Sequence, residues 1–182
     1  MSYHDTMTSA AAIAVMLACI LSASAARAED AVCKAVFDAG EKTMQTPNHQ
    51  YVTQTGGSFG SKGRRSESIH TGVASYLLVD GQWHRSPLDI KAMLEQEREN
   101  RRNTKNEHCA HVRDEAVDGE AAVVFSTHYE SEYAKVDALI WISRSSGLTL
   151  REELDMDPGE LGKSHTSVRT AYLGGQAPAG VK

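Results

Sequence analysis

Apolar and polar residues alternate over short segments along most of the chain, a pattern typical of β-strands. A first block of such segments covers residues 50–55, 65–71, 73–79 and 82–85, and a second covers 108–116, 120–129, 136–143, 148–154 and 166–173. Asp80-Gly81 and Asp118-Gly119 each separate two of these segments, and Asp-Gly between apolar runs is a strong hairpin signal. Because hairpins join neighbouring strands in antiparallel fashion, the pattern predicts an antiparallel sheet of about nine strands.

Two segments have helical periodicity instead. Asp30 can cap a helix from Ala31 to about Thr43, in which the apolar residues fall on one stripe. Ser86 and Pro87 have the residue types of a helix cap and a first helical position, so a second helix is expected to begin there. Its second half, up to Glu107, is almost wholly polar and is expected to project into solvent. The predicted fold class is therefore α+β, a single curved antiparallel sheet (an open half-barrel) with two covering helices.

Several of the predicted strands are apolar on both faces, notably residues 76–79, 121–125 and 138–142. A sheet with one wet face should alternate, and two helices can cover one face at most. Two interpretations stay open: a curved sheet with an apolar concave pocket, or an ordinary core closed by curvature and long side chains. If there is a pocket, we expect its ligand-binding lining to comprise Leu77, Val79, Val123, Phe125, Ile140 and Ile142.

The N-terminus has the layout of a secretion signal. Residues 11–21 are a nearly unbroken apolar run, and the small residues after it end in Ala26-Arg27-Ala28. A permanent membrane helix needs about 20 apolar residues, more than this run has. We expect cleavage after Ala28 and export to the periplasm, whether translation starts at Met1 or Met7.

This interpretation divides the 182-residue chain into three parts: a signal peptide over 1–28, one domain over 29–174 and a flexible C-terminal tail over 175–182. Cys19 leaves with the signal, so Cys33 and Cys109 are the even pair left for an oxidising compartment, and we predict that they form a disulfide. The alternative is two buried thiols. Closing a loop of about 75 residues should stabilise the domain by about 4 kcal/mol in the chain-entropy model.

One hairpin carries a family resemblance. The segment IWISRSSGLTLREEL at Ile140–Leu154 has an apolar strand, a Gly-Leu turn and a strand with Arg and Glu, and it resembles the LolA/LolB-like group of periplasmic lipoprotein-binding proteins. The succession YLLVDGQWHRSP at residues 76–87 is also similar to sheet proteins of this type. The resemblance implies an open half-barrel whose helices form a lid over an apolar hollow that receives acyl chains. Relatives in the group bind other apolar ligands or regulatory proteins, so it implies fold more than function.

The residues that carry catalytic or metal chemistry are scattered. His108 and His111 point to opposite faces of a strand, and no Cys or His pair has zinc-ligand spacing. Ser61 before Lys62 breaks a phosphate-binding loop, and no G-x-S-x-G occurs. The acidic run from Glu152 to Asp157 is interpreted as a solvated strand edge. We therefore expect no catalytic residue, no metal and no cofactor.

The leading functional hypothesis is a non-enzymatic periplasmic binding or carrier protein for an apolar ligand: a lipid, an acyl chain or a lipoprotein. A net charge of −5 argues against nucleic acid as a partner, and we do not expect an integral membrane protein. The alternative is an envelope protein-interaction module, a regulator, secretion accessory or inhibitor without a small-molecule ligand. In that case an exposed sheet face or the polar helix, which carries Arg98, Arg101 and Arg102, would dock the partner.

Overall fold

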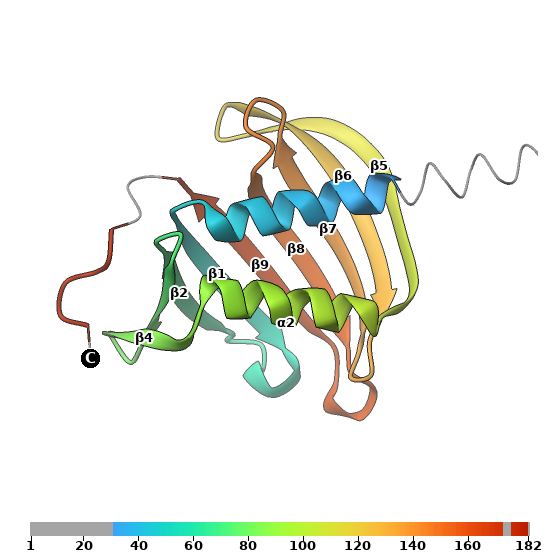
Figure 1. The fold of residues 1–182 in the computed structure, drawn as a ribbon. Helices are drawn as coiled ribbons and strands as arrows, with labels where there is room; N and C mark the ends of the chain where they lie inside the picture. The colour runs from blue at the N-terminus through green and yellow to red at the C-terminus, as the bar shows by residue number, and fades with distance from the viewer. Residues whose placement is uncertain (1–30, 173–175, 182) are drawn as a thin grey trace, which may run out of the picture.

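A computed structural model describes residues 31–172 and 176–181, so the expected signal peptide lies outside the described residues. One nine-stranded antiparallel sheet curves around two helices that both cover its concave face (Figure 1). The strand order is β4-β3-β2-β1-β9-β8-β7-β6-β5, so β4 and β5 are edges and the sheet is not closed into a barrel. The predicted α+β class, a curved antiparallel sheet with two covering helices, is confirmed.

The helices are α1, described over residues 31–45, and α2, Ile90–Arg102. The strands are β1 Asn48–Gly56, β2 Arg64–His70, β3 Ala74–Val79, β4 Gln82–Asp89, β5 Lys105–Val117, β6 Glu120–Glu130, β7 Lys135–Ser143, β8 Thr149–Asp157 and β9 Ser164–Ala171. Two short 3₁₀ turns, η1 Gly57–Phe59 and η2 Gly159–Leu161, lie in the loops. Within the described residues, no helix combines the length and the apolar character needed to cross a membrane.

The sheet is built from hairpins joined by one long-range pairing. Asp80-Gly81 and Asp118-Gly119 have positive φ at both residues, which is the geometry that tight hairpin turns require. The strands of the two blocks meet where β1 pairs with β9 along His49–Gly56. Because β9 is the last strand in sequence, this pairing joins the two hairpin blocks into a single sheet.

The described part of α1 buries a stripe toward the sheet that consists of Cys33, Val36, Ala39 and Thr43. Their spacing of three and four residues keeps them on one face of the helix. The buried stripe includes two small residues and a hydroxyl, so α1 lies close to the sheet. Thr43 accepts a hydrogen bond from the Thr149 backbone N–H at 2.9 Å, which fixes the helix over the start of β8.

The second helix begins later than its sequence predicts. Asp89, not Ser86, is the N-cap, and its Oδ1 accepts a hydrogen bond from the Ala92 N–H at 2.8 Å. Ser86 and Pro87 continue β4 instead. A proline lacks a backbone N–H, but β4 is an edge strand and can accommodate it. The expected helix start was therefore wrong, because an edge position permits proline in a strand as readily as at a helix start.

Two apolar clusters lie on opposite faces of the sheet. On the concave face, Ile142 packs against Val36 and Ala39 of α1, and Phe125 and Ile140 lie beside them. The second cluster comprises Ala122, Val124, Trp141 and Leu150. Val124 pairs with Trp141 in the β6–β7 ladder, so their side chains share the convex face. The strands are thus apolar on both sides because each face has its own core.

A disulfide fixes α1 to the edge of the sheet. Cys33 in α1 and Cys109 in β5 are bonded at 2.01 Å between sulfurs, and both are buried. The predicted pairing of these two cysteines is present in the structure. The bond connects segments 76 residues apart and holds the helix where it crosses edge strand β5 (Figure 1).

Replacing both cysteines by alanine should lower the free energy of unfolding by about 3–4 kcal/mol, because the unfolded chain regains the entropy of the open loop. Urea denaturation of the oxidised protein and the double variant measures the difference. Wild type under reducing conditions is the control and should match the variant. An unchanged denaturation midpoint would show that the bond contributes nothing to stability.

Candidate functional site

The six residues predicted to line a pocket lie on one face of the sheet. Phe125 pairs with Ile140 and Val123 with Ile142 across β6 and β7. Leu77 of β3 pairs with Ser68, which in turn pairs with Gln50 on β1. The registers place all six, including Val79, on the face that the helices cover. Their role in ligand binding remains a prediction.

These residues differ in what covers them. Phe125, Ile140 and Ile142 pack against α1 or beside it. Leu77 and Val79 lie far from α1, and 46% and 37% of their surface is exposed. Of the six, Ile140 is the one that lines the cavity between the helices and the sheet. The concave face is therefore partly packed core, partly cavity wall and partly open apolar surface.

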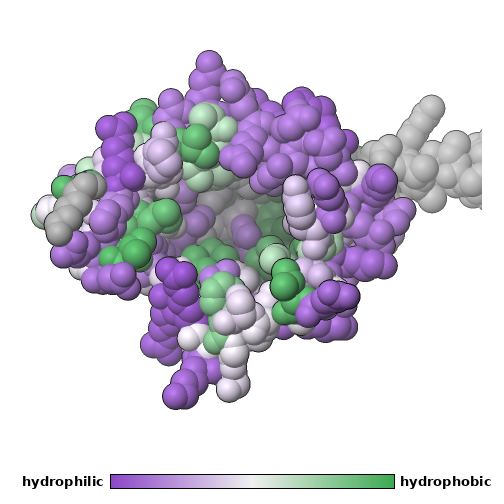
Figure 2. Space-filling view, turned by 90° about the horizontal axis from the view of Figure 1, so that it is seen from below, coloured by the Kyte–Doolittle hydropathy of each residue, from purple (hydrophilic) through white to green (hydrophobic). Residues whose placement is uncertain are grey.

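A cavity of about 290 Å³ separates the two helices from the sheet. Its apolar walls are Val36, Phe37, Met44, Ala138, Ile140 and Leu154. Seen from below, the molecule is hollowed at its centre, and apolar residues lie at several places around the opening among polar ones (Figure 2). We call this space the hollow. Its volume is at the lower end of the range, about 300–1,000 Å³, that ligand sites in proteins occupy.

The polar half of α2 is held against α1 and does not project freely, contrary to expectation. Arg98 donates two hydrogen bonds to the Glu41 carboxylate, from Nε at 2.7 Å and from Nη2 at 2.6 Å. The guanidinium of Arg101 lies 3.5 Å from the centre of the Phe37 ring. The hydrogen bond from Arg98 lowers the pKa of the Glu41 carboxyl. Charge pairing and cation–π contact, not an apolar stripe, therefore join the two helices at this end.

Glu152 lies on the floor of the hollow, and its position was not foreseen. The run from Glu152 to Asp157 was interpreted as a solvated strand edge, but β8 lies between β7 and β9 in the interior of the sheet. Alternation along β8 therefore directs Glu152 toward the helices and Glu153 toward the opposite face. The sequence contained this period-two signal, but not the information that β8 would be central.

The Glu152 carboxyl has an unusual environment. Burial, followed by the negative charge of Glu97 on α2, raises its pKa to about 7. In the described part of the chain, no group donates a hydrogen bond to it. Burial and the charges of Glu97 and Glu152 also raise the pKa of the nearby Tyr129 hydroxyl. The hollow thus combines apolar walls with two carboxyl groups that have no counter-ion, Glu97 and Glu152.

Glu152→Gln should change how stability depends on pH. A carboxyl whose pKa is raised on folding binds a proton more tightly in the folded state, so the native state loses stability as pH rises between about 4.5 and 7. The variant lacks this loss and should be more stable than wild type at pH 8, by up to about 3 kcal/mol, with little difference at pH 4. Urea denaturation at both pH values measures the effect. A difference independent of pH would contradict the assignment.

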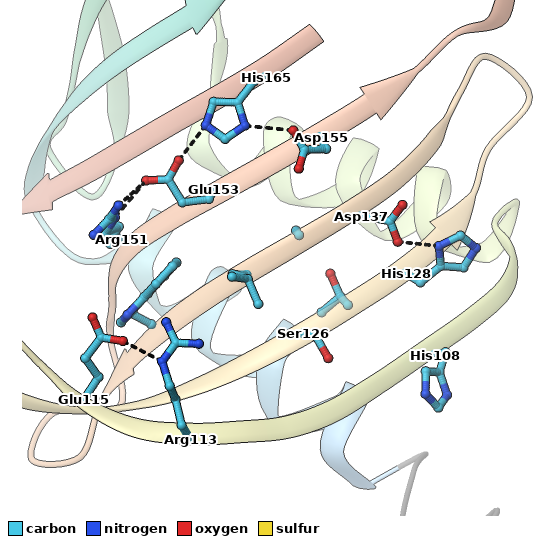
Figure 3. Close-up of a pocket in the computed structure, with 14 residues that line it drawn as sticks. His108, Arg113, Glu115, Ser126, His128, Asp137, Arg151, Glu153, Asp155 and His165 are labelled. Carbon is cyan, nitrogen blue, oxygen red and sulfur yellow. Dashed lines mark hydrogen bonds and ion pairs between the residues drawn. The ribbon is translucent and has the colours of Figure 1, made fainter. Parts of the chain in front are cut away.

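The convex face of the sheet is closed by long side chains. The guanidinium groups of Arg113 and Arg151 lie 5.8 Å and 4.7 Å from the Trp141 ring centre. Each arginine is held by a neighbouring carboxylate, Glu115 for Arg113 and Glu153 for Arg151 (Figure 3). Trp141 is part of the core on this face, since the residue is 3% exposed. On this face the second interpretation of the two-sided strands, closure by long side chains, is correct.

Histidines and carboxylates line a shallow groove beside these arginines. His165 lies between Asp155 and Glu153, 2.8 Å from each, and His128 lies 2.8 Å from Asp137 (Figure 3). The hydrogen bond to Asp155, and then that to Glu153, raises the pKa of His165. Among the residues that the structure describes, no three His, Cys, Asp or Glu side chains are arranged to bind a metal ion. These pairs are therefore interpreted as cross-strand contacts.

Comparison with known proteins gives similarity in structure and none in sequence. No protein-family model matches the chain, and no curated protein matches it. Among solved structures, the fold is similar to lipoprotein LppX of Mycobacterium tuberculosis, at 12% identity and a TM-score of 0.42, over 78% of this chain and 92% of that one. It is also similar to LprF of Mycobacterium bovis, at 10% identity and a TM-score of 0.42, over 80% and 95% of the two chains.

A third similar structure is a candidate outer-membrane lipoprotein-sorting protein domain from Vibrio parahaemolyticus, at 11% identity and a TM-score of 0.26, over 84% of this chain and 95% of that domain. At these values the similarity concerns the course of the chain alone and assigns no ligand. The class that the chain's own geometry defines is an α+β half-barrel with two helices over an apolar hollow.

Proposed function

We propose that the protein is a non-enzymatic, exported binding protein that accommodates the apolar part of an amphiphile in the hollow. The observation that carries the proposal is the incomplete cover of the concave face. The helices leave a cavity of about 290 Å³ whose walls include six apolar side chains beside polar ones. Each methylene that moves from water into such a cavity contributes about 0.8 kcal/mol to binding.

Further apolar surface is available beyond the hollow. Leu77 and Val79 continue the concave face on β3 and are exposed. A chain longer than the hollow can therefore extend along the sheet toward these residues. The predicted ligand-binding residues would then contact two parts of one ligand, with Ile140 inside the hollow and Leu77 outside it. Location in the periplasm is part of the same proposal, supported by the disulfide and by the signal-like sequence of residues 1–28.

Filling the hollow should weaken ligand binding without harming the fold. Gly40 of α1 lines the hollow, and a Cβ added there meets no atom within 4 Å. In Gly40→Phe the ring would occupy the cavity and displace at least two methylenes, which weakens binding of decanol roughly tenfold. Isothermal titration calorimetry measures the affinity.

Gly40→Ala is the matched control. It adds only a methyl group in open space and should bind decanol as wild type does. It should also be more stable by about 0.5–1 kcal/mol, because alanine favours a helix interior. If Gly40→Phe binds decanol as tightly as wild type, the ligand does not enter the hollow.

The Arg98–Glu41 pair should control entry. It joins the two helices over the hollow, and α2 has only two buried residues, Ile90 and Leu94, both near its start. Arg98→Gln should therefore let the end of α2 move and increase the association rate for decanol several-fold. Stopped-flow fluorescence measures that rate. Lys91→Gln, at an exposed position of the same helix, is the control and should leave the association rate unchanged. Equal rates in wild type and both variants would mean that movement of α2 does not control entry.

The interaction-module alternative loses support at its predicted docking residues. Arg98 and Arg101 are engaged with Glu41 and Phe37 of the protein itself, and Arg102 pairs with Glu99 of the same helix. Charge reversal at Arg98 or Arg101 would disturb the helix pair whether or not a partner protein exists. Recovery of a bound amphiphile from the purified protein, by lipid extraction and native mass spectrometry, tests the binding proposal directly. An empty protein that also fails to bind added amphiphiles would reject it.

A further inference from the structure

The charges around the hollow are unequally paired. Arg98 is engaged by Glu41, and Arg101 lies 3.5 Å from Glu107 and against the Phe37 ring. Glu97 and Glu152 line the same cavity, and among the described residues neither forms an ion pair. The arginines at the hollow are therefore already neutralised, and the unpaired charge that faces a ligand is negative.

Glu152 is the deeper of these two carboxyl groups. It projects from a central strand of the sheet into the hollow, whereas Glu97 projects from α2 above it. Apolar residues Ile140 and Leu154 line the floor beside it. There the carboxyl loses part of its hydration and gains no hydrogen-bond partner among the described residues, so a molecule that donates hydrogen bonds to it would offset that loss.

We propose that the hollow selects amphiphiles with a cationic head group, such as a protonated amine, and that Glu152 is the residue that receives it. This inference rests on the proposed function and names the ligand class of the same site. The ammonium group would lie between Glu152 and Glu97 and donate hydrogen bonds to both. The Tyr129 hydroxyl, which also lines the hollow, provides a further acceptor.

An anionic head group fits the same site poorly. A fatty-acid carboxylate at this depth would approach Glu152 and Glu97, and like charges repel one another there. To reach Arg98 or Arg101 it would have to displace Glu41 or Glu107 from existing ion pairs. A neutral alcohol can donate one hydrogen bond to Glu152 but gains no charge attraction.

Three ligands with the same alkyl chain test the proposal: decylamine, decanol and decanoate, titrated calorimetrically at pH 8. Wild type should bind decylamine at least tenfold more tightly than either of the others. Glu152→Gln should reduce the affinity for decylamine to that for decanol. Glu153→Gln is the matched control, because the neighbouring side chain points to the other face of the sheet, and it should keep the preference for the amine.

The pH dependence gives a second readout. Below pH 7 Glu152 becomes protonated, whereas an alkylamine, like a lysine side chain, stays charged up to about pH 10. The other ionisable or charged groups that face Glu152 are Glu97, Arg98 and Arg101 of α2, Glu41 of α1 and Tyr129 of β6. Affinity for decylamine should therefore fall by up to about tenfold per pH unit below 7 in wild type, and much less in Glu152→Gln.

The outcomes separate this inference from the proposed function. If decanol binds and Gly40→Phe blocks it, but decylamine has no advantage or Glu152→Gln keeps the full advantage, the cationic preference is wrong and the hollow remains a binding site. If decanoate binds most tightly of the three ligands, the cationic preference is also wrong. If none of the three ligands binds, the proposed function fails as well.

Discussion

The structure depends on one constraint: the central strands are apolar on both faces, so both faces must be covered. The convex side is covered locally, by arginines that lie over Trp141 and are held by carboxylates. The concave side is covered by the two helices. Because α1 packs closely through small residues while α2 is largely polar, the helical cover is complete over Ile142 and incomplete over the middle of β7 and β8.

Because this cover is incomplete, the fold has a cavity that is the candidate ligand site. A helix with a continuous apolar stripe would sink onto the sheet and fill the hollow. Instead, α2 is apolar only at its start and is attached at its other end by Arg98 to Glu41. An ion pair joins the helices without filling the space beneath them. The same polar character that makes α2 a poor core helix therefore leaves a cavity, into which the proposed ligand would enter beside α2.

The buried carboxyl on the cavity floor belongs to the same arrangement. Glu152 costs stability in its ionised form, because burial and Glu97 both oppose its charge. A side chain that served packing alone at this position would be apolar, like its neighbour Leu154. A costly polar group at the bottom of a hollow is more readily explained by recognition than by stability.

Local signals in the sequence were enough to predict the hairpins, the disulfide pair and the α+β class. They were also enough to predict that the six candidate lining residues share one face of the sheet. Asp-Gly turns and period-two alternation act between neighbours in the chain, so they can be read without coordinates. The helix start at Asp89, the central place of β8 and the Arg98–Glu41 pair could not be predicted. Each depends on which strands are edges or which helices lie side by side, and the partners in the Arg98–Glu41 pair are 57 positions apart in the chain. The sequence by itself determined that the central strands are apolar on both sides, whereas only the tertiary structure decided which of those sides is sealed, because sealing requires groups brought together by pairings such as β1 with β9.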